Sequence, residues 1–287
     1  MNKEINIFKK IWYSIGKPKK YNEMLLEGLK KAIQYITVLI ILFSFVISGI
    51  TVYKINQNYK LQIEYVENNI PELSYSEGTL KLETEKELIL TDEIVKAVIG
   101  GAVIINTNSS DEKLVENYTK QITAEGDYGV LLLPESLITI SNKNNEIKTE
   151  KYTYTEIFED NFEKDIEFKK DDVIEYLGNV PYMNYFTTYT VTYFVSMYII
   201  MAVNILVMSL VGLVYIKLKK LNLRFKEILT ISIYSSTIAI LLNIVYYIIL
   251  GIFDIAIPYF DAVYISVPYI YMLTTLFGIK QAQNKAK

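Results

Sequence analysis

Residues 32–53 read AIQYITVLIILFSFVISGITVY, an apolar stretch without a single charged side chain. A helix needs roughly 20 apolar residues to cross a hydrocarbon core about 30 Å thick. Inside lipid the backbone must satisfy its own hydrogen bonds, and a helix does so. The stretch therefore predicts a transmembrane helix. A cleaved signal peptide is the alternative, but the basic segment before the stretch is unusually long and no A-x-A site follows it.

Three more charge-free stretches follow, at residues 176–216, 228–253 and 262–279, and the apolar part of the first begins near residue 189. Each is long enough to span a bilayer, although the last one only just reaches the required length. Because Pro268 and several tyrosines interrupt that last stretch, a re-entrant or surface helix is the alternative there. The four stretches predict an integral membrane protein, an α-helical bundle of four transmembrane helices with a domain inserted after the first.

The charges next to these stretches predict the orientation of the chain. Three segments are basic, with net charges of +5 (1–31), +4 (217–227) and +3 (280–287), whereas residues 54–188 carry −13. Lysine-rich flanks stay in the cytoplasm, so both termini should be cytoplasmic. We therefore expect a cytoplasmic N-terminus (1–31), transmembrane helices (32–53, 189–216, 228–250 and 262–279), an acidic extracytoplasmic domain (54–188), a cytoplasmic loop (217–227), an outer loop (251–261) and a cytoplasmic tail (280–287).

The N-terminal segment contains apolar residues at helical spacing, Phe8, Ile11, Trp12 and Ile15, among several lysines. This pattern predicts a short basic amphipathic helix, ended at Pro18. Such a helix can lie in the membrane interface with Trp12 at headgroup level and the lysines near anionic lipid. The alternative is a soluble tail whose lysines only fix the orientation.

The segment between the first two spans changes pattern and reads as an α+β domain of sufficient length to have its own core. Its strands are indicated by alternating apolar residues and by turn residues such as Glu77-Gly78. The double glycine at 100–101 indicates a bulge or a close approach of two backbones, and Ser109 with Glu112 has the spacing of a capping box. We expect a helix over 55–69, a hairpin over 73–88, a buried strand over 97–107, a helix from Ser109 to Gly126, two or three strands over 128–154 with Pro134 at an edge or bend, and helix over 155–180.

The predicted spans contain no ionisable side chain, which disfavours an ion or proton path through them. Five polar residues should instead form hydrogen bonds between helices, with a solute path as the alternative. Four tyrosines on one face of the second span, together with Trp12, predict an interfacial aromatic belt, with sugar stacking as the alternative. The helix–helix contacts are Asn204, Asn243, Ser209, Ser232 and Ser236; the belt is Trp12, Tyr182, Tyr185, Tyr189 and Tyr193.

The composition excludes several kinds of chemistry. With no cysteine and no histidine, disulfides, thiolate or imidazole metal sites and Ser-His-Asp catalysis cannot occur. The sequence contains no phosphate-binding, dinucleotide-binding or nucleophile-elbow motif, so we expect no catalytic centre and no cofactor. Nucleic-acid binding is disfavoured because the basic residues flank the spans. Nine carboxylates between Glu156 and Glu175 leave a cation site or a hydrolytic pair as alternatives.

Four segments resemble an uncharacterised membrane protein family of Gram-positive bacteria: FKKIWYSIGKPKKY (8–21), IPELSYSEGTLKL (70–82), VIINTNSS (103–110) and YGVLLLPESLITIS (128–141). The resemblance extends over nearly the whole chain. Some members of that family carry the label maltodextrin utilisation membrane protein, which implies an association with carbohydrate uptake. The family usually reads Ile-Asp-Thr where this chain has Ile105-Asn106-Thr107.

These features predict a non-enzymatic accessory, sensing or scaffold subunit of the cell membrane. Its partners would be the lipid bilayer and either another membrane protein or further copies of this chain. A permease component for a small solute is the alternative; with only four spans, it would need to form an oligomer. A membrane-tethered hydrolase that uses the outer carboxylates is the second alternative.

Overall fold

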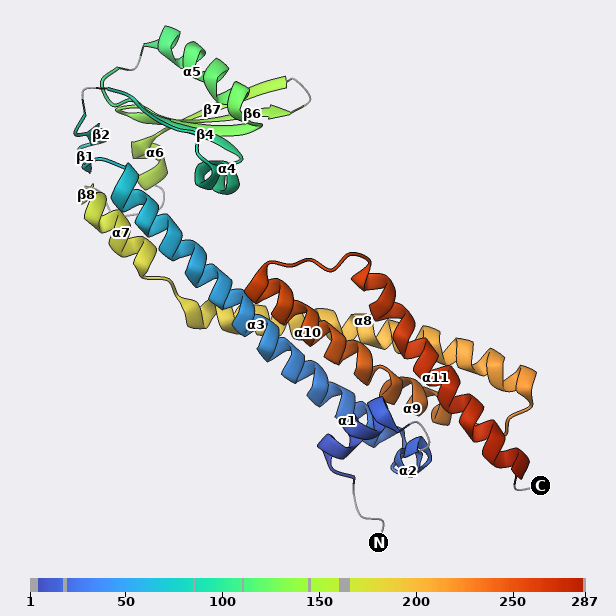
Figure 1. The fold of residues 1–287 in the computed structure, drawn as a ribbon. Coiled ribbons are helices and arrows are strands. Elements are labelled where there is room, and N and C mark those ends of the chain that lie inside the picture. The colour runs from blue at the N-terminus through green and yellow to red at the C-terminus, as the bar shows by residue number, and fades with distance from the viewer. Residues whose placement is uncertain are drawn as a thin grey trace. The chain divides into compact units, whose positions relative to one another are not determined.

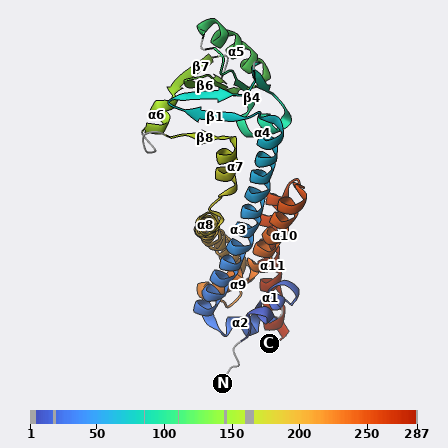
Figure 2. The ribbon, with the colours of Figure 1, turned by 90° about the vertical axis from the view of Figure 1, so that its left-hand side faces the viewer.

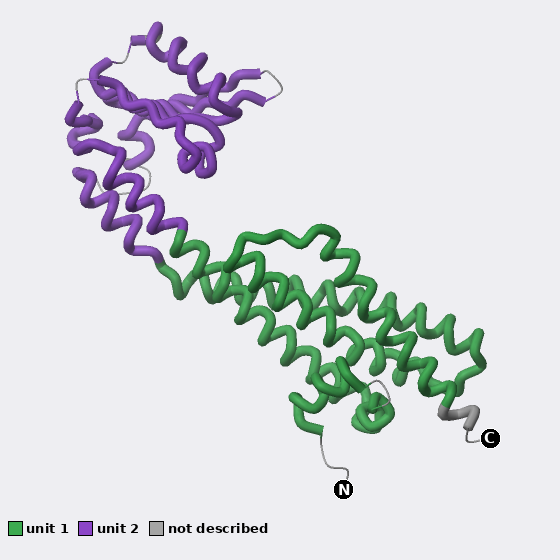
Figure 3. Tube along the Cα trace, viewed as in Figure 1, with its two compact units in different colours: residues 1–57, 181–287 green, residues 58–180 purple. Residues whose placement is uncertain are grey.

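The computed structural model describes residues 5–17, 20–84, 86–109, 111–143, 146–159 and 166–285. The chain forms two compact units (Figure 3). Unit 1 comprises Met1–Gln57 and Pro181–Lys287, and unit 2 comprises Asn58–Val180. All the described strands belong to unit 2.

Unit 1 is helical throughout its described elements (Figure 1). It has four segments that are long and apolar enough to cross a membrane, and two consecutive helices together form the third of them. They are α3, α8, α9 with α10, and α11. The helices of this unit are α1 (Ile7–Gly16), α2 (Tyr21–Leu25), the first part of α3 (Gly28–Asn69), α8 (Tyr182–Lys219), α9 (Phe225–Ser235), α10 (Thr237–Phe253) and α11 (Phe260–Lys285).

The apolar surface of these helices is larger than their mutual packing requires. In the most apolar window of each candidate span, only 22 to 44% of the residues are buried inside the protein. In water such an extensive exposed apolar surface is unfavourable, whereas in a bilayer the same side chains contact lipid. The predicted class, a helical membrane protein with an inserted sheet-containing domain, is confirmed at this level.

The core of unit 1 follows one stripe of α3. Its buried residues include Tyr35, Leu39, Phe43 and Ile47, spaced by four residues and therefore on one face of the helix. On the other side of the bundle, a Cβ atom added at Gly212 of α8 would lie 2.7 Å from the Cγ2 atom of Ile228 and 3.2 Å from the Sδ atom of Met272. This glycine therefore lets α8, α9 and α11 approach closely, as small residues do in membrane bundles.

The third span is broken in the middle. The sequence predicts one helix over 228–250, but α9 ends at Ser235 and α10 begins at Thr237. The hydroxyl of Ser236 donates a hydrogen bond to the carbonyl of Ser232 at 2.9 Å. Consecutive serine and threonine residues bend helices because their hydroxyls compete for backbone carbonyls. The span nevertheless extends over Phe225–Phe253, and the irregular turn at Ser236 is the feature that the sequence did not predict.

Unit 2 contains two sheets and short helices (Figures 1 and 2). The larger sheet has the strand order β3-β4-β5-β6-β7, and the smaller has the order β2-β1-β8. Only β4 and β5 are parallel, and α5 connects them. The elements are β1 (Leu73–Ser76), β2 (Thr79–Leu82), β3 (Leu88–Leu90), α4 (Glu93–Ile99), β4 (Gly101–Ile105), α5 (Glu112–Glu125), β5 (Tyr128–Leu132), β6 (Ser136–Lys143), β7 (Glu146–Thr153), α6 (Tyr154–Glu159), β8 (Phe168–Lys169) and α7 (Lys170–Gly178).

Several predicted elements are confirmed. Helix α3 continues to Asn69, just before Pro71, and β1 and β2 form the predicted hairpin. Glu77 and Gly78 both have positive φ angles, of 48° and 77°, as a two-residue hairpin turn of type I′ requires. Pro134 lies in the bend between β5 and β6, which leaves the central strand β5 uninterrupted.

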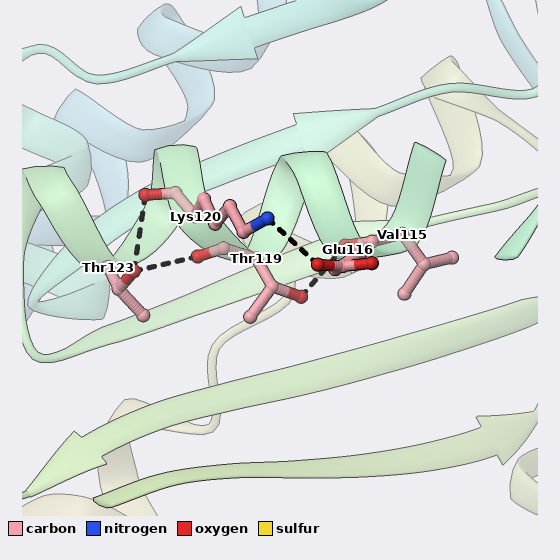
Figure 4. Close-up of polar contacts among 5 residues, drawn as sticks. All are labelled: Val115, Glu116, Thr119, Lys120 and Thr123. Carbon is pink, nitrogen blue, oxygen red and sulfur yellow. Dashed lines mark hydrogen bonds and ion pairs between the residues drawn. The ribbon is translucent and has the colours of Figure 1, made fainter. Parts of the chain in front are cut away.

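Helix α5, which confirms the helix predicted to end near Gly126, covers one face of the larger sheet (Figures 1 and 2). Tyr118 and Ile122 are buried against Ile104 and Leu131 from the two parallel strands. Polar contacts on the same helix are shown in Figure 4: Lys120 and Glu116 form an ion pair at 2.8 Å, and Thr119 and Thr123 donate to carbonyls of the preceding turn.

Two local predictions in unit 2 were wrong. The sequence predicts a strand over 97–107, but residues 97–99 are the end of α4. Gly100 ends this helix with a φ of +87°, and the strand β4 starts only at Gly101. Asp111, and not Ser109, caps α5, because its carboxylate accepts a hydrogen bond from the Lys113 amide at 2.9 Å. The last predicted helix, over 155–180, divides into α6, β8 and α7, and its residues 160–165 lie outside the described residues.

The edges of the larger sheet are unlike its centre. Strand β3 has three residues, and β7 reads EIKTEKYT with almost every residue exposed. The neighbouring β6 alternates buried and half-buried positions, as a strand with one covered face does. Charged residues therefore line one edge of the sheet, and the other edge is very short.

Candidate functional site

Unit 1 contains a cluster of buried polar side chains where α1, α2 and the start of α3 meet the break between α9 and α10. Both α1 and α2 contact α9, and α1 also contacts α10. We call this cluster the polar junction. It consists of Lys10, Ser14, Tyr21, Glu27, Tyr35, Tyr234, Ser235 and Thr237.

An ion pair with little solvent exposure lies at one side of the polar junction. The Nζ atom of Lys10 is 2.6 Å from the Oε2 atom of Glu27, and their side chains are 10% and 12% exposed. The backbone amide of Ile5 donates to the other oxygen of Glu27 at 2.8 Å. Glu27 precedes Gly28, whose φ of +80° forms the turn into α3 and favours glycine.

Tyrosine hydroxyls join the helices on the other side of the polar junction. Tyr21 donates to the Ser14 carbonyl at 3.0 Å, and the hydroxyls of Tyr35 and Thr237 are 2.9 Å apart. The ring of Tyr234 has its centroid 6.3 Å from that of Tyr21 and 5.2 Å from that of Tyr35. Helices α2, α3 and α9 therefore each contribute one tyrosine ring to a single buried cluster.

Sequence reasoning missed the charged part of the polar junction. Both Lys10 and Glu27 lie outside the predicted spans, so the search for ionisable residues inside the spans did not include them. One signal was present: Ile7, Lys10, Ile11 and Ser14 share a helical face, and that face is the one buried in the structure. A lysine on the apolar face of a helix indicates a buried partner of opposite charge.

The structure brings some of the predicted helix–helix contacts together. Ser232 donates to the Met272 sulfur on α11 at 3.5 Å, which is a contact between helices. Ser209 and Ser236 instead donate to carbonyls of their own helices. Asn204 and Ser236 line the same small cavity, of about 20 Å³, between α8, α10 and α11. Asn243 is half-buried and forms no hydrogen bond with any described residue.

The tyrosines predicted for the second span do share one face. The rings of Tyr185, Tyr189 and Tyr193 stack in succession, with centroids 6.4 and 6.0 Å apart. Tyr182 donates to the Asn56 side chain at 2.9 Å, and the hydroxyls of Tyr193 and Thr51 are 3.2 Å apart. Tyr182 and Tyr193 thus connect α8 to α3, and the role of the four tyrosines as an interfacial belt stays a prediction.

Helix α1 has a second apolar face, which points away from the polar junction. Phe8 is 75% exposed and Trp12 is 60% exposed, although Ile11 and Ile15 on the same predicted stripe are half-buried. Exposed aromatic side chains next to lysines are typical of helices that lie in the membrane interface. The predicted helix is confirmed; its end at Pro18 lies outside the described residues.

The location of Trp12 can be measured directly because the chain has one tryptophan. In nanodiscs we expect its fluorescence to be quenched more by lipids brominated near the headgroup than by lipids brominated near the chain end. The double variant Phe8→Trp with Trp12→Phe moves the fluorophore by one helical turn. In this variant the headgroup-brominated lipid should again quench more than the lipid brominated near the chain end. Absence of quenching by either lipid would show that α1 does not lie in the interface.

Unit 2 has a polar pocket of about 500 Å³ at the carboxyl end of β4, which we call the Asn106 pocket. The Asn106 amide donates to the Tyr118 hydroxyl at 2.8 Å, and Tyr118 donates to the Glu87 carboxylate. Burial, together with the hydrogen bond to Glu87, raises the pKa of Tyr118, which keeps this hydroxyl protonated as a donor. The pocket is lined by Lys86, Glu87, Ile89, Asn106, Asn108 and Ser109.

The carboxylates between Glu156 and Glu175 that the structure describes have mainly local roles. Glu156 accepts a hydrogen bond from the Thr153 amide at 2.9 Å, and Asp172 accepts one from the Lys169 amide at 2.7 Å. Within the described part of the chain, no three acidic side chains come together in a way that could hold a metal ion. Asp160, Glu163 and Asp165 lie outside the described residues.

The four long apolar helices, the broken third span and the sheet-containing unit define a class: an α-helical, membrane-associated protein with an inserted α+β domain. The chain belongs to the family described as protein of unknown function (DUF1189), which matches residues 8–276. This match confirms the prediction that the chain is a member of an uncharacterised protein family. Neither curated proteins nor solved structures gave a significant match.

Proposed function

We propose that this protein is a non-enzymatic accessory subunit of the bacterial cell membrane, which senses a condition outside the cell and passes it to a membrane partner or to another copy of itself. In this proposal both termini are cytoplasmic and unit 2 is extracytoplasmic, since the basic segments flank the spans and residues 54–188 are acidic. The resemblance to proteins labelled for maltodextrin utilisation suggests a place beside carbohydrate uptake.

The observation that carries the proposal is the continuity of α3. This helix has 42 residues, begins directly after Glu27 of the polar junction and ends four residues before β1 of unit 2. In this proposal α3 is the element that passes a change in unit 2 to the polar junction, because its sequence is helical from Gly28 to Asn69. The Asn106 pocket supplies a recognition surface within unit 2, with charged, amide and hydroxyl groups in its lining.

The orientation can be tested with single cysteines, because the natural chain has none. We expect Tyr176→Cys in α7 and Tyr259→Cys before α11 to react with a membrane-impermeant maleimide on intact cells, since these side chains are 79% and 87% exposed. Leu218→Cys, at the exposed end of α8, should react only after the membrane is opened. Labelling of Leu218→Cys on intact cells would contradict the proposed orientation.

The partner can be tested by purification. Affinity capture of the full chain in mild detergent should recover a stable partner in stoichiometric amount, or a defined oligomer. Variants in the Asn106 pocket, such as Asn106→Ala, should retain the complex and lose its response to the external condition. A clean monomer without a partner in several mild detergents would contradict the proposal.

A permease component is the second candidate, and the broken third span favours it. Transporters often place their binding sites where a membrane helix is interrupted, and buried ionisable groups mark such paths. Tyr234, two residues before the break at Ser236, lies beside Glu27 of the Lys10–Glu27 pair. Uptake of protons, Na⁺ or maltose into liposomes that contain only this protein would support this candidate over the accessory one.

A further inference from the structure

An apolar groove of about 230 Å³ lies in unit 1 between α3, α8 and α9. All the side chains that the structure places around it are apolar or aromatic. Ile36 and Ile205 are buried in its floor, whereas Ile33, Ala202 and Leu206 are exposed at its rim. The groove is therefore open to the surroundings of the bundle, and in a membrane these surroundings are hydrocarbon. Its occupant must then be apolar as well.

The groove is long and narrow. Its lining extends over residues 33–40 of α3 and 198–206 of α8, which is about 10 to 12 Å at 1.5 Å per residue. A volume of about 230 Å³ over this length leaves a cross-section of roughly 20 Å². A helix with its side chains is about 10 Å across and needs roughly 80 Å². The groove is thus too narrow for a helix of a second copy, but it accommodates a single hydrocarbon chain over most of one leaflet, which is about 15 Å deep.

Lysines precede the groove on two of its helices. On α3, Lys30 lies one helical turn before the lining residue Ile33 and shares its face of the helix. On α9, Lys226 precedes the lining residue Leu229 in the same way. Both lysines are exposed, and neither forms an ion pair within the part of the chain that the structure describes. Two positive charges beside the groove are therefore available to an anion.

Both lysines lie at the same end of the groove, because α3 and α9 run in the same direction. Residues 33–40 of α3 face residues 198–206 of α8, whereas the later Thr51 contacts the earlier Tyr193. Helix α8 therefore runs antiparallel to α3. After a short turn the chain returns along α8 as α9, which restores the direction of α3.

We propose that the groove binds one acyl chain of an anionic phospholipid, whose phosphate lies at Lys30 and Lys226. An apolar groove that ends at two cations matches such a lipid, with the chain along α3 and α8 and the headgroup at the membrane surface. Basic pockets between membrane helices bind anionic headgroups in this way. A neutral phospholipid has the same chains but carries its own cation beside the phosphate, so it is bound more weakly. The proposal concerns unit 1 alone and does not depend on what unit 2 recognises.

Native mass spectrometry of the detergent-solubilised full chain tests the proposal, with phosphatidylglycerol and phosphatidylcholine of identical chains as the probes. We expect each protein chain to retain one phosphatidylglycerol molecule, with a Kd about tenfold lower than that of phosphatidylcholine. Lys30→Gln with Lys226→Gln should abolish this preference. The control, Lys217→Gln with Lys219→Gln, removes the same charge from the end of α8, about 16 Å beyond the groove, and should keep the preference.

Two tryptophan substitutions on α8 locate the retained lipid. Ala202→Trp places a large ring in the groove and should lower the retention of phosphatidylglycerol several-fold. Val203 is the next residue, is 55% exposed and lies outside the lining that the structure shows, so Val203→Trp should retain the lipid as the natural protein does. Thermal unfolding of both variants checks that the fold is kept.

Equal retention of the two lipids by the natural protein would show annular lipid only and would overturn the proposal. Undiminished retention of phosphatidylglycerol in a folded Ala202→Trp variant would overturn it too, as would an undiminished preference after Lys30→Gln with Lys226→Gln. A dimer without retained lipid, which Ala202→Trp dissociates, would instead assign the groove to a second copy of the chain.

Discussion

Replacing Gly101 by alanine is expected to disrupt the centre of unit 2. A Cβ atom at this position would lie 1.8 Å from the backbone carbonyl oxygen of Tyr128, its partner in the parallel β4–β5 pair. A backbone atom cannot move aside as a side chain can, so the two strands must separate. We expect a loss of about 3 kcal/mol or more in the stability of this unit. Hydrogen exchange of peptides from β4 and β5 in the full chain measures the effect.

The matched control for this substitution is Gly178→Ala, at the end of α7 in the same unit. An added Cβ atom at Gly178 meets nothing within 4 Å. Alanine is also the better helix former, so exchange in β4 and β5 should stay as in the natural protein. Equal protection of these strands in Gly101→Ala and Gly178→Ala would show that the close approach at Gly101 is not required.

Separating the buried ion pair is expected to have the second large effect. Lys10→Met leaves the Glu27 carboxylate buried without a cation beside it. Glu27→Gln leaves the Lys10 ammonium group buried without an anion beside it. Breaking a buried pair in this way costs about 3 kcal/mol. The double variant, Lys10→Met with Glu27→Gln, should recover most of this loss, because the amide oxygen still accepts from the Ile5 amide.

Thermal unfolding of the solubilised full chain, followed by the fluorescence of Trp12 on the same helix as Lys10, measures this cycle. Lys20→Met is the control, because the Lys20–Glu23 pair is close to half exposed and should matter far less. Additive losses in the double variant would contradict the pairing of Lys10 with Glu27.

The spans could be predicted from the sequence because lipid imposes one requirement, a run of about 20 apolar residues, that no distant contact alters. The hairpin at Glu77-Gly78 was predictable for a similar reason, since its turn chemistry is local. The strand predicted from residue 97 failed because residues 97–99 are apolar and β-branched, whereas they are the last turn of a helix that Asp92 caps and Gly100 ends.

The polar junction could not be predicted in the same way. Lys10 and Glu27 are 17 residues apart, and their burial depends on how α1 and α2 pack against α9, which no periodicity reveals. The break at Ser236 was also missed, because the serines around it are compatible with a continuous span when only hydropathy is considered. Sequence periodicity identifies which helices exist, whereas the candidate site depends on contacts between distant residues, such as Tyr35 and Thr237, which are 202 positions apart.

The charged edge strand β7 has a consequence for how copies of this protein can associate. Glu146, Lys148, Glu150 and Lys151 along its length oppose intermolecular strand addition, and β3 at the opposite edge is too short to template it. Sheet growth between neighbouring molecules is therefore suppressed. If the protein self-assembles, the larger sheet of unit 2 stays closed to strand exchange, and the contact between copies must be formed by other surfaces.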